Sequence, residues 1–385
     1  MTRRVCVVTG SRAEYGLLRP LIQEIQASRE LALQLVVTGM HLSHEFGHTV
    51  DAIRQDCLEI TDTVEMLLSS DTPVAIASSV GVGLIGFAGT LQRLAPDILV
   101  VLGDRFEILP PVIAALVAKI PVAHVAGGEL SEGAFDDSIR HSVTKMSHLH
   151  FAATEAYRAR VIQMGEDPSR VFNVGGLAAD AIRRVPLLDR EALESALGLT
   201  FGQRNLLVTF HPVTLDANSS TQFAELLRAL EELDETRLVF TLPNADPGGR
   251  ELIEMVNAFV ARHPTAKAFG SLGQQKYLSC LQFVDGVVGN SSSGLGEVPT
   301  FRKGTINIGD RQQGRERADS VIDCAPDHRS ISAAIRRLYS TDFQAGLPSV
   351  RNPYGDGGAS ERIVSILSAF PLGSILKKKF HDLAA

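Results

Sequence analysis

The chain has 385 residues, 45% of them hydrophobic, and a formal net charge of −7. This length predicts two domains, the hydrophobic fraction excludes a disordered chain, and the acidic balance excludes an overall basic surface for nucleic acid. Uninterrupted apolar runs fall short of the ~18 residues of a membrane span, and four widely spaced cysteines favour a reducing cytoplasm over a disulfide framework.

The first half of the chain alternates short apolar runs with segments of helical periodicity. The apolar part of the N-terminal run MTRRVCVVTG is too short for a signal peptide, so it predicts a first buried strand. Strands separated by helices imply βαβ crossovers and a parallel sheet. The predicted strands are Val5–Thr9, Leu33–Thr38, Ile98–Leu102, Val122–Val125, Leu149–Thr154 and Val171–Val174, and the predicted helices are Arg12–Ala27, Pro73–Leu94 and Asp137–Ser147.

A second series of the same kind begins after a charged helix at Asp189–Leu197. Its predicted strands are Asn205–Phe210, Arg237–Leu242, Val284–Gly289 and Gly304–Ile308, and its predicted helices are Thr221–Leu233 and Gly249–Arg262. We therefore predict an α/β fold of two Rossmann-like, doubly wound parallel-sheet domains, residues 1–180 and 181–365, facing one another across a cleft. Such clefts commonly bind nucleotides. The basic run Leu376–Phe380 is expected to be a solvated end of an amphipathic helix rather than a membrane contact.

Acidic side chains gather directly after two of the predicted strands. Asp104 and Arg105 follow Ile98–Leu102, and a loop that starts at Glu129 and includes Glu132 follows Val122–Val125. Because the carboxyl ends of parallel strands meet at one edge of the sheet, these acids should lie together. Neighbouring carboxylates raise one another's pKa, which suits general acids and bases near neutral pH. The pattern predicts an enzyme.

The helix after this loop carries two pairs of opposite polarity at a spacing of four residues. Asp136 pairs in this way with Arg140, and Asp137 with His141, so each pair shares a helix face. Stabilising surface pairs would give the same spacing. We favour a site, because these acids and those of the loop together exceed what a surface turn requires.

Three glycine- or arginine-bearing loops predict a phosphate site. A turn at Gly10–Arg12 opens a helix, where backbone N–H groups and Arg12 could bind an anion. The small residues after Val284–Gly289 suit phosphate oxygens, and Glu297 could take a ribose diol from one to two turns into the next helix. An arginine-rich loop follows Gly304–Ile308 and could cover a pyrophosphate. The candidate residues are Arg12, Asn290, Ser291, Ser292, Ser293, Glu297, Arg311, Arg315 and Arg317. Each loop has an alternative interpretation without a ligand. The first could be only a tight turn between strand and helix, the second an ordinary helix cap, and the third a mixed-charge surface loop.

Two histidines follow predicted strands directly. His211 comes after Asn205–Phe210, and His41 after Leu33–Thr38, so both are placed for a site at a sheet edge. The loop that holds His41 also contains His44 and His48, which makes a metal site a rival interpretation. We expect no metal, because that loop offers no carboxylate or cysteine at matching spacing.

Taken together, nine motifs resemble the hydrolysing UDP-N-acetylglucosamine 2-epimerases of sialic acid biosynthesis, nearly end to end. They are TGSRAEYG (Thr9–Gly16), VTGMHLS (Val37–Ser43), GDRFE (Gly103–Glu107), HVAGGE (His124–Glu129), DDSIRHSVTK (Asp136–Lys145), TFHP (Thr209–Pro212), NSSSGLGEVP (Asn290–Pro299), NIGDRQQGRERADSVID (Asn307–Asp323) and NPYGDGGAS (Asn352–Ser360). The resemblance implies the glycosyltransferase-B architecture, with a C-terminal helix, residues 366–385, that packs back on the first domain.

For activity, the resemblance implies removal of the C2 proton of a UDP-sugar with anti loss of UDP, and then hydration of the resulting 2-acetamidoglycal. It assigns acid/base work to Asp104, to Glu129 and to Asp136 or Asp137, assistance of UDP departure to His211, and UDP binding to Arg12, Ser291, Ser292, Glu297 and the Arg311–Arg317 loop. His41, Arg105, Arg140, His141, Asn290 and Ser293 are expected to contact substrate. The resemblance implies no metal or other cofactor, no nucleic acid or membrane partner, and a homodimer or homotetramer.

These motifs leave the identity of the substrate's sugar open. FHPVT after the strand Asn205–Phe210 and AGGELSEG after Val122–Val125 favour the hydrolysing branch over its non-hydrolysing relatives. We expect UDP-N-acetylglucosamine as substrate and N-acetylmannosamine as product. The alternative is UDP-N,N'-diacetylbacillosamine, the substrate of the legionaminic acid pathway, because residues 130–134 lie where members of the branch differ. A UDP-sugar glycosyltransferase and a nucleotide-sugar sensor are more remote alternatives.

Overall fold

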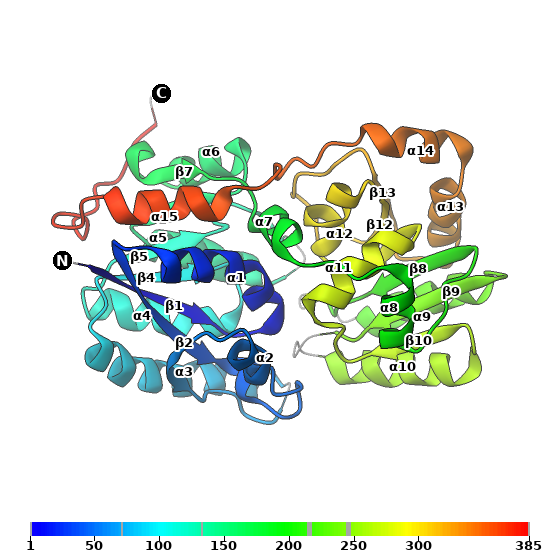
Figure 1. Ribbon diagram of the computed structural model, residues 1–385, viewed down its shortest axis with the longest axis horizontal. Helices are drawn as coiled ribbons and strands as arrows, with labels where there is room; N and C mark the ends of the chain where they lie inside the picture. The colour runs from blue at the N-terminus through cyan, green and yellow to red at the C-terminus, as the bar shows by residue number, and fades with distance from the viewer. Residues whose placement is uncertain (1, 71, 132–133, 214–217, 244–247, 384–385) are drawn as a thin grey trace. The chain divides into compact units, whose positions relative to one another are not determined.

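The computed structural model describes residues 2–70, 72–131, 134–213, 218–243 and 248–383. It contains two compact units, each built on its own parallel sheet (Figure 1). The first unit contains residues 1–129, 136–183 and 356–385, and the second contains residues 130–135 and 184–355. Glu132 of the predicted acidic loop lies outside the described residues.

The first unit has a seven-stranded parallel sheet with the order β3-β2-β1-β4-β5-β6-β7. The strand order reverses between β1 and β4, which is where doubly wound sheets place their ligands. The strands are β1 (Arg3–Thr9), β2 (Leu31–Thr38), β3 (Ile60–Val64), β4 (Ile98–Leu102), β5 (Val122–Val125), β6 (Leu149–Ala152) and β7 (Val171–Asn173). Its helices are α1 (Arg12–Ala27), α2 (Val50–Gln55), α3 (Pro73–Leu94), α4 (Leu109–Val117), α5 (Asp136–Met146), α6 (Glu155–Gln163), α7 (Leu177–Arg184) and α15 (Ala359–Ala369).

The second unit has a six-stranded parallel sheet with the order β10-β9-β8-β11-β12-β13, which reverses between β8 and β11. The strands are β8 (Arg204–Thr209), β9 (Thr236–Thr241), β10 (Ala266–Phe269), β11 (Gly286–Gly289), β12 (Gly304–Ile308) and β13 (Val321–Cys324). Its helices are α8 (Arg190–Leu197), α9 (Ser219–Glu231), α10 (Gly249–Arg262), α11 (Gly273–Phe283), α12 (Ser293–Gly296), α13 (His328–Leu338) and α14 (Thr341–Gly346).

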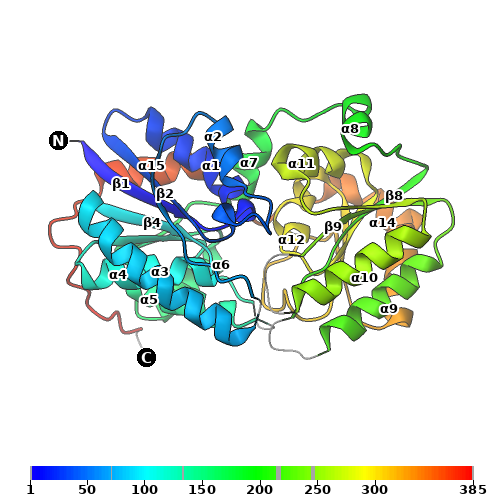
Figure 2. The same cartoon turned by 90° about the horizontal axis from the view of Figure 1, so that it is seen from below.

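Side-chain alternation along β1 explains why helices cover both faces of the first sheet. Val5 and Val7 belong to a core formed with α1, α2 and α15, whereas Cys6 and Val8 belong to a second core formed with α3, α4 and α5. Figure 2 shows α1 and α15 on one face of the sheet and α3, α4 and α5 on the other. A strand that is buried on both faces is mostly apolar. The central strands are therefore the easiest elements to predict.

The end of the chain completes the first unit. Helix α15 packs against α1 (Figure 1). The Asp180 carboxylate accepts hydrogen bonds from the N–H groups of Gly358, Ala359 and Ser360 at the start of α15, and Arg3 donates to the carbonyls of Leu367 and Phe370 at its end. An anion at the N-terminus and a cation at the C-terminus both complement the helix dipole.

The C-terminal segment that packs back on the first unit differs from the prediction in where it begins and in how much of it is helical. It begins at Asp356 rather than residue 366, and its helix ends at Ala369. The basic run Leu376–Phe380 is therefore not a helix end. Instead, Lys378 donates to the carbonyls of Lys145 and Ser147 at the end of α5, at 2.9 and 2.6 Å. The domain boundary predicted at residue 180 lies within α7, three residues before the boundary between the units.

Helix α3 is the one described helix that is long and apolar enough to cross a membrane, by length and composition only. The expectation that no segment reaches that length was therefore wrong. Its inner face contributes Phe87 and Leu91 to the core, while Val74 and Ile85 are exposed. Because α3 packs on α4 and β3, it is a covering helix of this sheet.

Three strands were missed, and all three lie at sheet edges: β3, β10 and β13. β3 reads ITDTV with alternating partial burial, and β13 reads VIDC with a single fully buried residue. An edge strand is only partly covered and tolerates polar side chains, so it lacks the continuous apolar run that marks a central strand.

Candidate active site

The first site element is the turn between β1 and α1. The Ser11 side chain caps α1, and the Glu14 carboxylate accepts hydrogen bonds from the N–H groups of Gly10 and Ser11, at 2.7 and 3.3 Å. This capping box fixes the turn that presents Arg12. Burial raises the pKa of Glu14 to about 8, against the lowering effect of the Gly10 hydrogen bond. Burial also lowers the pKa of Arg12.

Glu107, which was not predicted as a site residue, lies beneath this turn with 0% exposure. Its carboxylate oxygens accept hydrogen bonds from Nε and Nη2 of Arg105, at 3.1 and 3.0 Å. A Cβ added at Gly10 or Gly39 would come within 2.7 or 2.8 Å of the Glu107 side chain, so both turns need glycine. Glu107 thus fixes the guanidinium of Arg105 at the point where the strand order reverses. Its position in the GDRFE motif was the signal that could have identified it.

Arg140 on α5 brings two of the predicted acids together. Its side chain is 1% exposed, pairs with the Asp104 carboxylate, and donates from Nη1 to Oε2 of Glu129 at 3.1 Å. Asp104 follows β4 and Glu129 follows β5, so the predicted convergence at the sheet edge is confirmed. The guanidinium remains charged at all relevant pH values and lowers the cost of holding two carboxylates in a partly buried position.

The first turns of α5 supply further titratable groups. Asp136 and Asp137 begin the helix, and both are half-buried. Nε2 of His141 lies 3.4 Å from Oδ2 of Asp137, as the spacing of four residues predicted. Burial lowers the pKa of His141, while the Asp137 charge raises it. Titratable carboxylates, a histidine and a counter-cation therefore lie at this edge.

His41 is fully buried at the end of β2, and threonines contact both of its ring nitrogens. Nε2 lies 3.0 Å from Oγ1 of Thr9, and Nδ1 lies 2.8 Å from Oγ1 of Thr49. Burial lowers its pKa to about 4, so the ring is neutral. These contacts fix the β2 turn, and a substrate contact by His41 stays a prediction.

In the second unit, Asn290 pairs with the backbone of His211. The His211 N–H donates to Oδ1 of Asn290 at 2.7 Å, and Nδ2 of Asn290 donates to the His211 carbonyl at 2.8 Å. Gly289 has φ +142°, and a Cβ there would lie 1.9 Å from the Thr209 carbonyl oxygen. The Asn290 side chain thus joins the ends of β8 and β11, and it positions His211, which is 7% exposed.

The serine-rich turn after β11 ends in a chain of hydroxyls. The Ser293 hydroxyl donates its only proton to the Glu297 carboxylate. Its Oγ atom must therefore accept the hydrogen bond from the Tyr277 hydroxyl, at 2.6 Å. Burial raises the pKa of Glu297, while the Ser293 hydrogen bond opposes that rise. Glu297 was predicted to lie one to two turns into a helix. It instead follows α12 directly, because that helix ends at Gly296.

The three arginines of the loop after β12 have different surroundings. Arg311 and Gln312 both donate to the Asn290 carbonyl, at 3.1 and 2.9 Å. Arg315 donates to the Leu130 carbonyl and to Oγ of Ser131, at 2.8 and 2.9 Å. It thereby anchors Leu130 and Ser131 on the second unit.

Arg317 pairs with Asp323 at 2.6 Å on a partly exposed surface. Ser291 is half-buried and Ser292 is exposed. The predicted substrate contacts of all these residues stay predictions.

Among the described residues, no group of three or more histidine, cysteine, aspartate or glutamate side chains is placed to hold a metal ion. In the loop that suggested a metal site, the rings of His44 and His48 stack with centroids 4.4 Å apart, and His48 contacts Asp51. That the reaction needs no cofactor stays a prediction.

Residues 23–368 match the model of the UDP-N-acetylglucosamine 2-epimerase family. The chain belongs to this family. It is 40% identical over 99% of both chains to a GDP/UDP-N,N'-diacetylbacillosamine 2-epimerase (hydrolyzing) of Campylobacter jejuni. It is 34% identical to a UDP-N,N'-diacetylbacillosamine 2-epimerase (hydrolyzing) of Legionella pneumophila, over 98% of this chain and 99% of that one. It is also 38% identical to polysialic acid biosynthesis protein P7 of Escherichia coli, over 96% and 94%. These relatives place it in the hydrolysing branch of nucleotide-sugar 2-epimerases.

Solved structures of the family share the two-sheet fold. A co-structure of S. aureus MnaA with UDP superposes with a TM-score of 0.81 at 19% identity, covering 99% of this chain and 100% of that one. A UDP-GlcNAc 2-epimerase from Neisseria meningitidis bound to UDP-GlcNAc gives 0.78 at 16% identity, over 94% and 99%. The predicted α/β fold with two parallel sheets is thus confirmed. The predicted homo-oligomer stays a prediction.

Proposed function

We propose that this 2-epimerase hydrolyses UDP-N,N'-diacetylbacillosamine, releasing UDP and the free sugar inverted at C2. Two relatives that align with 98–99% of the chain carry this activity in their names, at 40% and 34% identity. This support reverses the order of the two sugars expected from the sequence, where UDP-N-acetylglucosamine came first. One of these names includes a GDP-linked form, so the nucleotide also needs a direct test.

The proposed chemistry has two steps. A carboxylate base removes the C2 proton, the C2–H electron pair forms the C1–C2 double bond, and the C1–O bond breaks with its electrons leaving on UDP. Water then adds its oxygen to C1, and an acid delivers a proton to C2 from the face that inverts the centre. Both steps need positioned acids and bases, which typically contribute 10²–10⁴-fold each.

The observation that supports the proposed chemistry is Arg140 held between Asp104 and Glu129. Two carboxylates on one buried guanidinium give a base and an acid that remain close without repelling one another strongly. Within the second unit, His211, Arg311 and the serine-rich turn are groups that suit a pyrophosphate.

UDP-N-acetylglucosamine remains the second candidate substrate. The relative named for polysialic acid biosynthesis is 38% identical over 96% of this chain, which is nearly the level of the first relative. Polysialic acid synthesis would draw on N-acetylmannosamine, the product expected from the sequence.

The test is proton NMR in D2O with UDP-N,N'-diacetylbacillosamine, its GDP-linked form and UDP-N-acetylglucosamine in separate tubes. We expect free C2-inverted diacetamido sugar carrying deuterium at C2, together with UDP, and at least tenfold slower turnover of UDP-N-acetylglucosamine. Faster turnover of UDP-N-acetylglucosamine would overturn the choice of sugar but keep the mechanism. Product without deuterium at C2 would overturn the elimination mechanism.

A further inference from the structure

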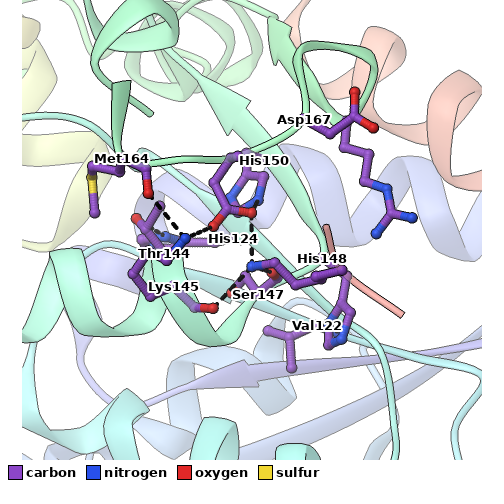
Figure 3. A network of polar contacts seen from close by, with 12 residues as sticks. Val122, His124, Thr144, Lys145, Ser147, His148, His150, Met164 and Asp167 are labelled. Atoms are coloured by element: carbon purple, nitrogen blue, oxygen red, sulfur yellow. Dashed lines mark hydrogen bonds and ion pairs between the residues drawn. The ribbon is translucent and has the colours of Figure 1, made fainter. Parts of the chain in front are cut away.

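His124 is a fully buried histidine on β5, and both of its ring nitrogens have partners that lead to the acid site. Nε2 lies 2.7 Å from the carbonyl oxygen of Gly103, and Nδ1 lies 3.0 Å from Oγ1 of Thr144. Thr144 is on α5, and Gly103 immediately precedes Asp104. Figure 3 shows His124 and Thr144 next to the polar contacts of Lys145 and His150.

The chemistry of the two partners fixes where the ring proton sits. Burial lowers the pKa of His124 to about 3, against the Gly103 hydrogen bond, so the ring is neutral and carries one proton. A carbonyl oxygen can only accept, so Nε2 holds that proton and donates to Gly103. Nδ1 must then accept from the Thr144 hydroxyl. The hydrogen bonds run in one direction, from α5 through the ring to the β4 turn.

The turn that receives this hydrogen bond is held from both sides by β5. The Gly103 N–H donates to the Val125 carbonyl at 2.9 Å, and its carbonyl accepts from His124 at 2.7 Å. Gly103 has φ +81°, a conformation that favours glycine. With both sides of its peptide unit fixed, this residue sets the direction in which Asp104 leaves the strand.

Helix α5 therefore reaches Asp104 by two routes. Arg140 and Thr144 are four residues apart and share a helix face. Arg140 pairs with the Asp104 carboxylate directly, while Thr144 acts on the backbone before it through His124. The packing leaves no spare space, because a Cβ at Gly127 would lie 3.1 Å from both Nδ1 of His124 and Oγ1 of Thr144.

We propose that His124 and Thr144 are positioning residues for the epimerase reaction, which hold the Gly103–Asp104 turn so that the carboxylate is aligned with C2 of the sugar. This inference rests on the proposed function. A misplacement of the base by about 1 Å can cost roughly 100-fold in rate without weakening ground-state binding. The signature is therefore a loss of kcat with little change in KM.

The test compares Thr144→Val with Thr144→Ser, using the release of UDP from whichever substrate the wild-type enzyme accepts. Valine has the shape of threonine but no hydroxyl, so we expect kcat to fall by about 10-fold or more with KM within about twofold. Serine restores the donor and should keep kcat within about threefold of wild type. Equal kcat for the two variants, or an unchanged kcat in Thr144→Val, would overturn the proposal.

His150 offers a matched control. It is the residue of β6 that pairs with His124 across the sheet, it is equally buried, and its ring contacts Glu166 at 3.0 Å instead of the β4 turn. His150→Gln should lower the melting temperature without the loss of kcat, measured per folded enzyme. A kcat loss as large as that of Thr144→Val would mean that the effect comes from packing, and would overturn the positioning role.

A readout without turnover separates this inference from the proposed function. In ¹⁵N-labelled protein at pH 7, His124 should be neutral with its proton on Nε2, and Thr144→Val should shift the Nδ1 resonance and the ¹³C carboxylate resonance of Asp104. A proton on Nδ1, or an unmoved Asp104 resonance, would overturn the inference. If the wild-type enzyme releases UDP from no substrate, the proposed function fails, while these resonances still decide the positioning role.

Discussion

The sheet edges of the two units hold their functional groups by different forces. At the ends of β4 and β5, the first unit joins Asp104 and Glu129 through the charged side chain of Arg140. At the ends of β8 and β11, the second unit joins His211 to the strand end through the neutral amide of Asn290. Two carboxylates that lie close together are stabilised by a counter-charge, whereas two strand ends can be joined by neutral hydrogen bonds. The comparison predicts different responses to substitution.

The largest difference should appear in turnover. Asp104→Asn removes a predicted base while keeping its size, and we expect kcat to fall by about 10²–10⁴-fold. UDP affinity, measured by calorimetry, should remain within about threefold of wild type. In the second unit, Asn290→Ala should instead weaken UDP binding, because it releases the His211 backbone. An Asp104→Asn enzyme with more than a tenth of wild-type kcat would remove Asp104 from the acid/base role.

Stability should separate the two edges next. Arg140→Met leaves two partly buried carboxylates without their cation and should cost about 3–5 kcal/mol. Asn290→Ala loses neutral hydrogen bonds and should cost about 1–3 kcal/mol. The control is Arg93→Met, which removes an exposed pair with Asp62 and should cost about 0–1 kcal/mol. Urea unfolding measures all three, and equal costs for Arg140→Met and Asn290→Ala would contradict the comparison.

The buried Glu14 of the first unit should make the stability of the protein depend on pH. Burial raises its pKa to about 8 in the folded protein, from the model-peptide value of 4.5. Between these values the folded state binds more protons than the unfolded state, so stability falls as pH rises. We expect Glu14 to contribute a decline of at most about 1.4 kcal/mol per pH unit between pH 4.5 and 8. Glu14→Gln should flatten that decline in urea unfolding at pH 5, 6.5 and 8, whereas the exposed Glu30→Gln should not.

The smallest effect should come from the hydroxyl chain of the second unit. Tyr277→Phe removes one donor to Ser293 and should cost about 0.5–1.5 kcal/mol. Ser293→Ala should cost more, about 1–3 kcal/mol, because it leaves both Tyr277 and Glu297 without this partner. The reverse order in urea unfolding would show that Tyr277 acts on Glu297 independently of Ser293.

The fold was predictable where burial is complete. The central strands β1, β4, β8 and β11 each contain an apolar run, and helices α1, α3 and α10 were predicted at their observed limits. The edge strand β7 was predicted, but the edge strands β3, β10 and β13 were not, because an open side allows polar side chains that break the pattern on which the prediction depends. The C-terminal return was inferred from resemblance, and its bounds were wrong because its helix ends at Ala369 and the chain continues without one.

The site was predictable where a side chain directly follows a strand, as Asp104 and His211 do. The contacts of these side chains with residues distant in the sequence were not predictable. The spacing of four residues predicted Asp136 as the partner of Arg140, whereas Arg140 pairs with Asp104 and Glu129 on two other loops. Glu14 reads as an ordinary residue in the first turn of a helix, since only the fold places Glu107 beneath the same turn. Periodicity identifies the face of a helix but not what lies opposite it.

The attachment of α15 also constrains the order in which the protein can form during synthesis. The first sheet begins at Arg3, yet the helix that covers α1 runs from Ala359 to Ala369 and is capped by Asp180 and by Arg3 itself. A ribosome that has completed β7 therefore carries a first unit with one flank of its core still open, for the time needed to translate nearly 190 further residues, which is roughly 10–40 s. Protease should therefore cleave the first unit of chains that are stalled before Asp356. The first unit of released full-length chains should resist this cleavage.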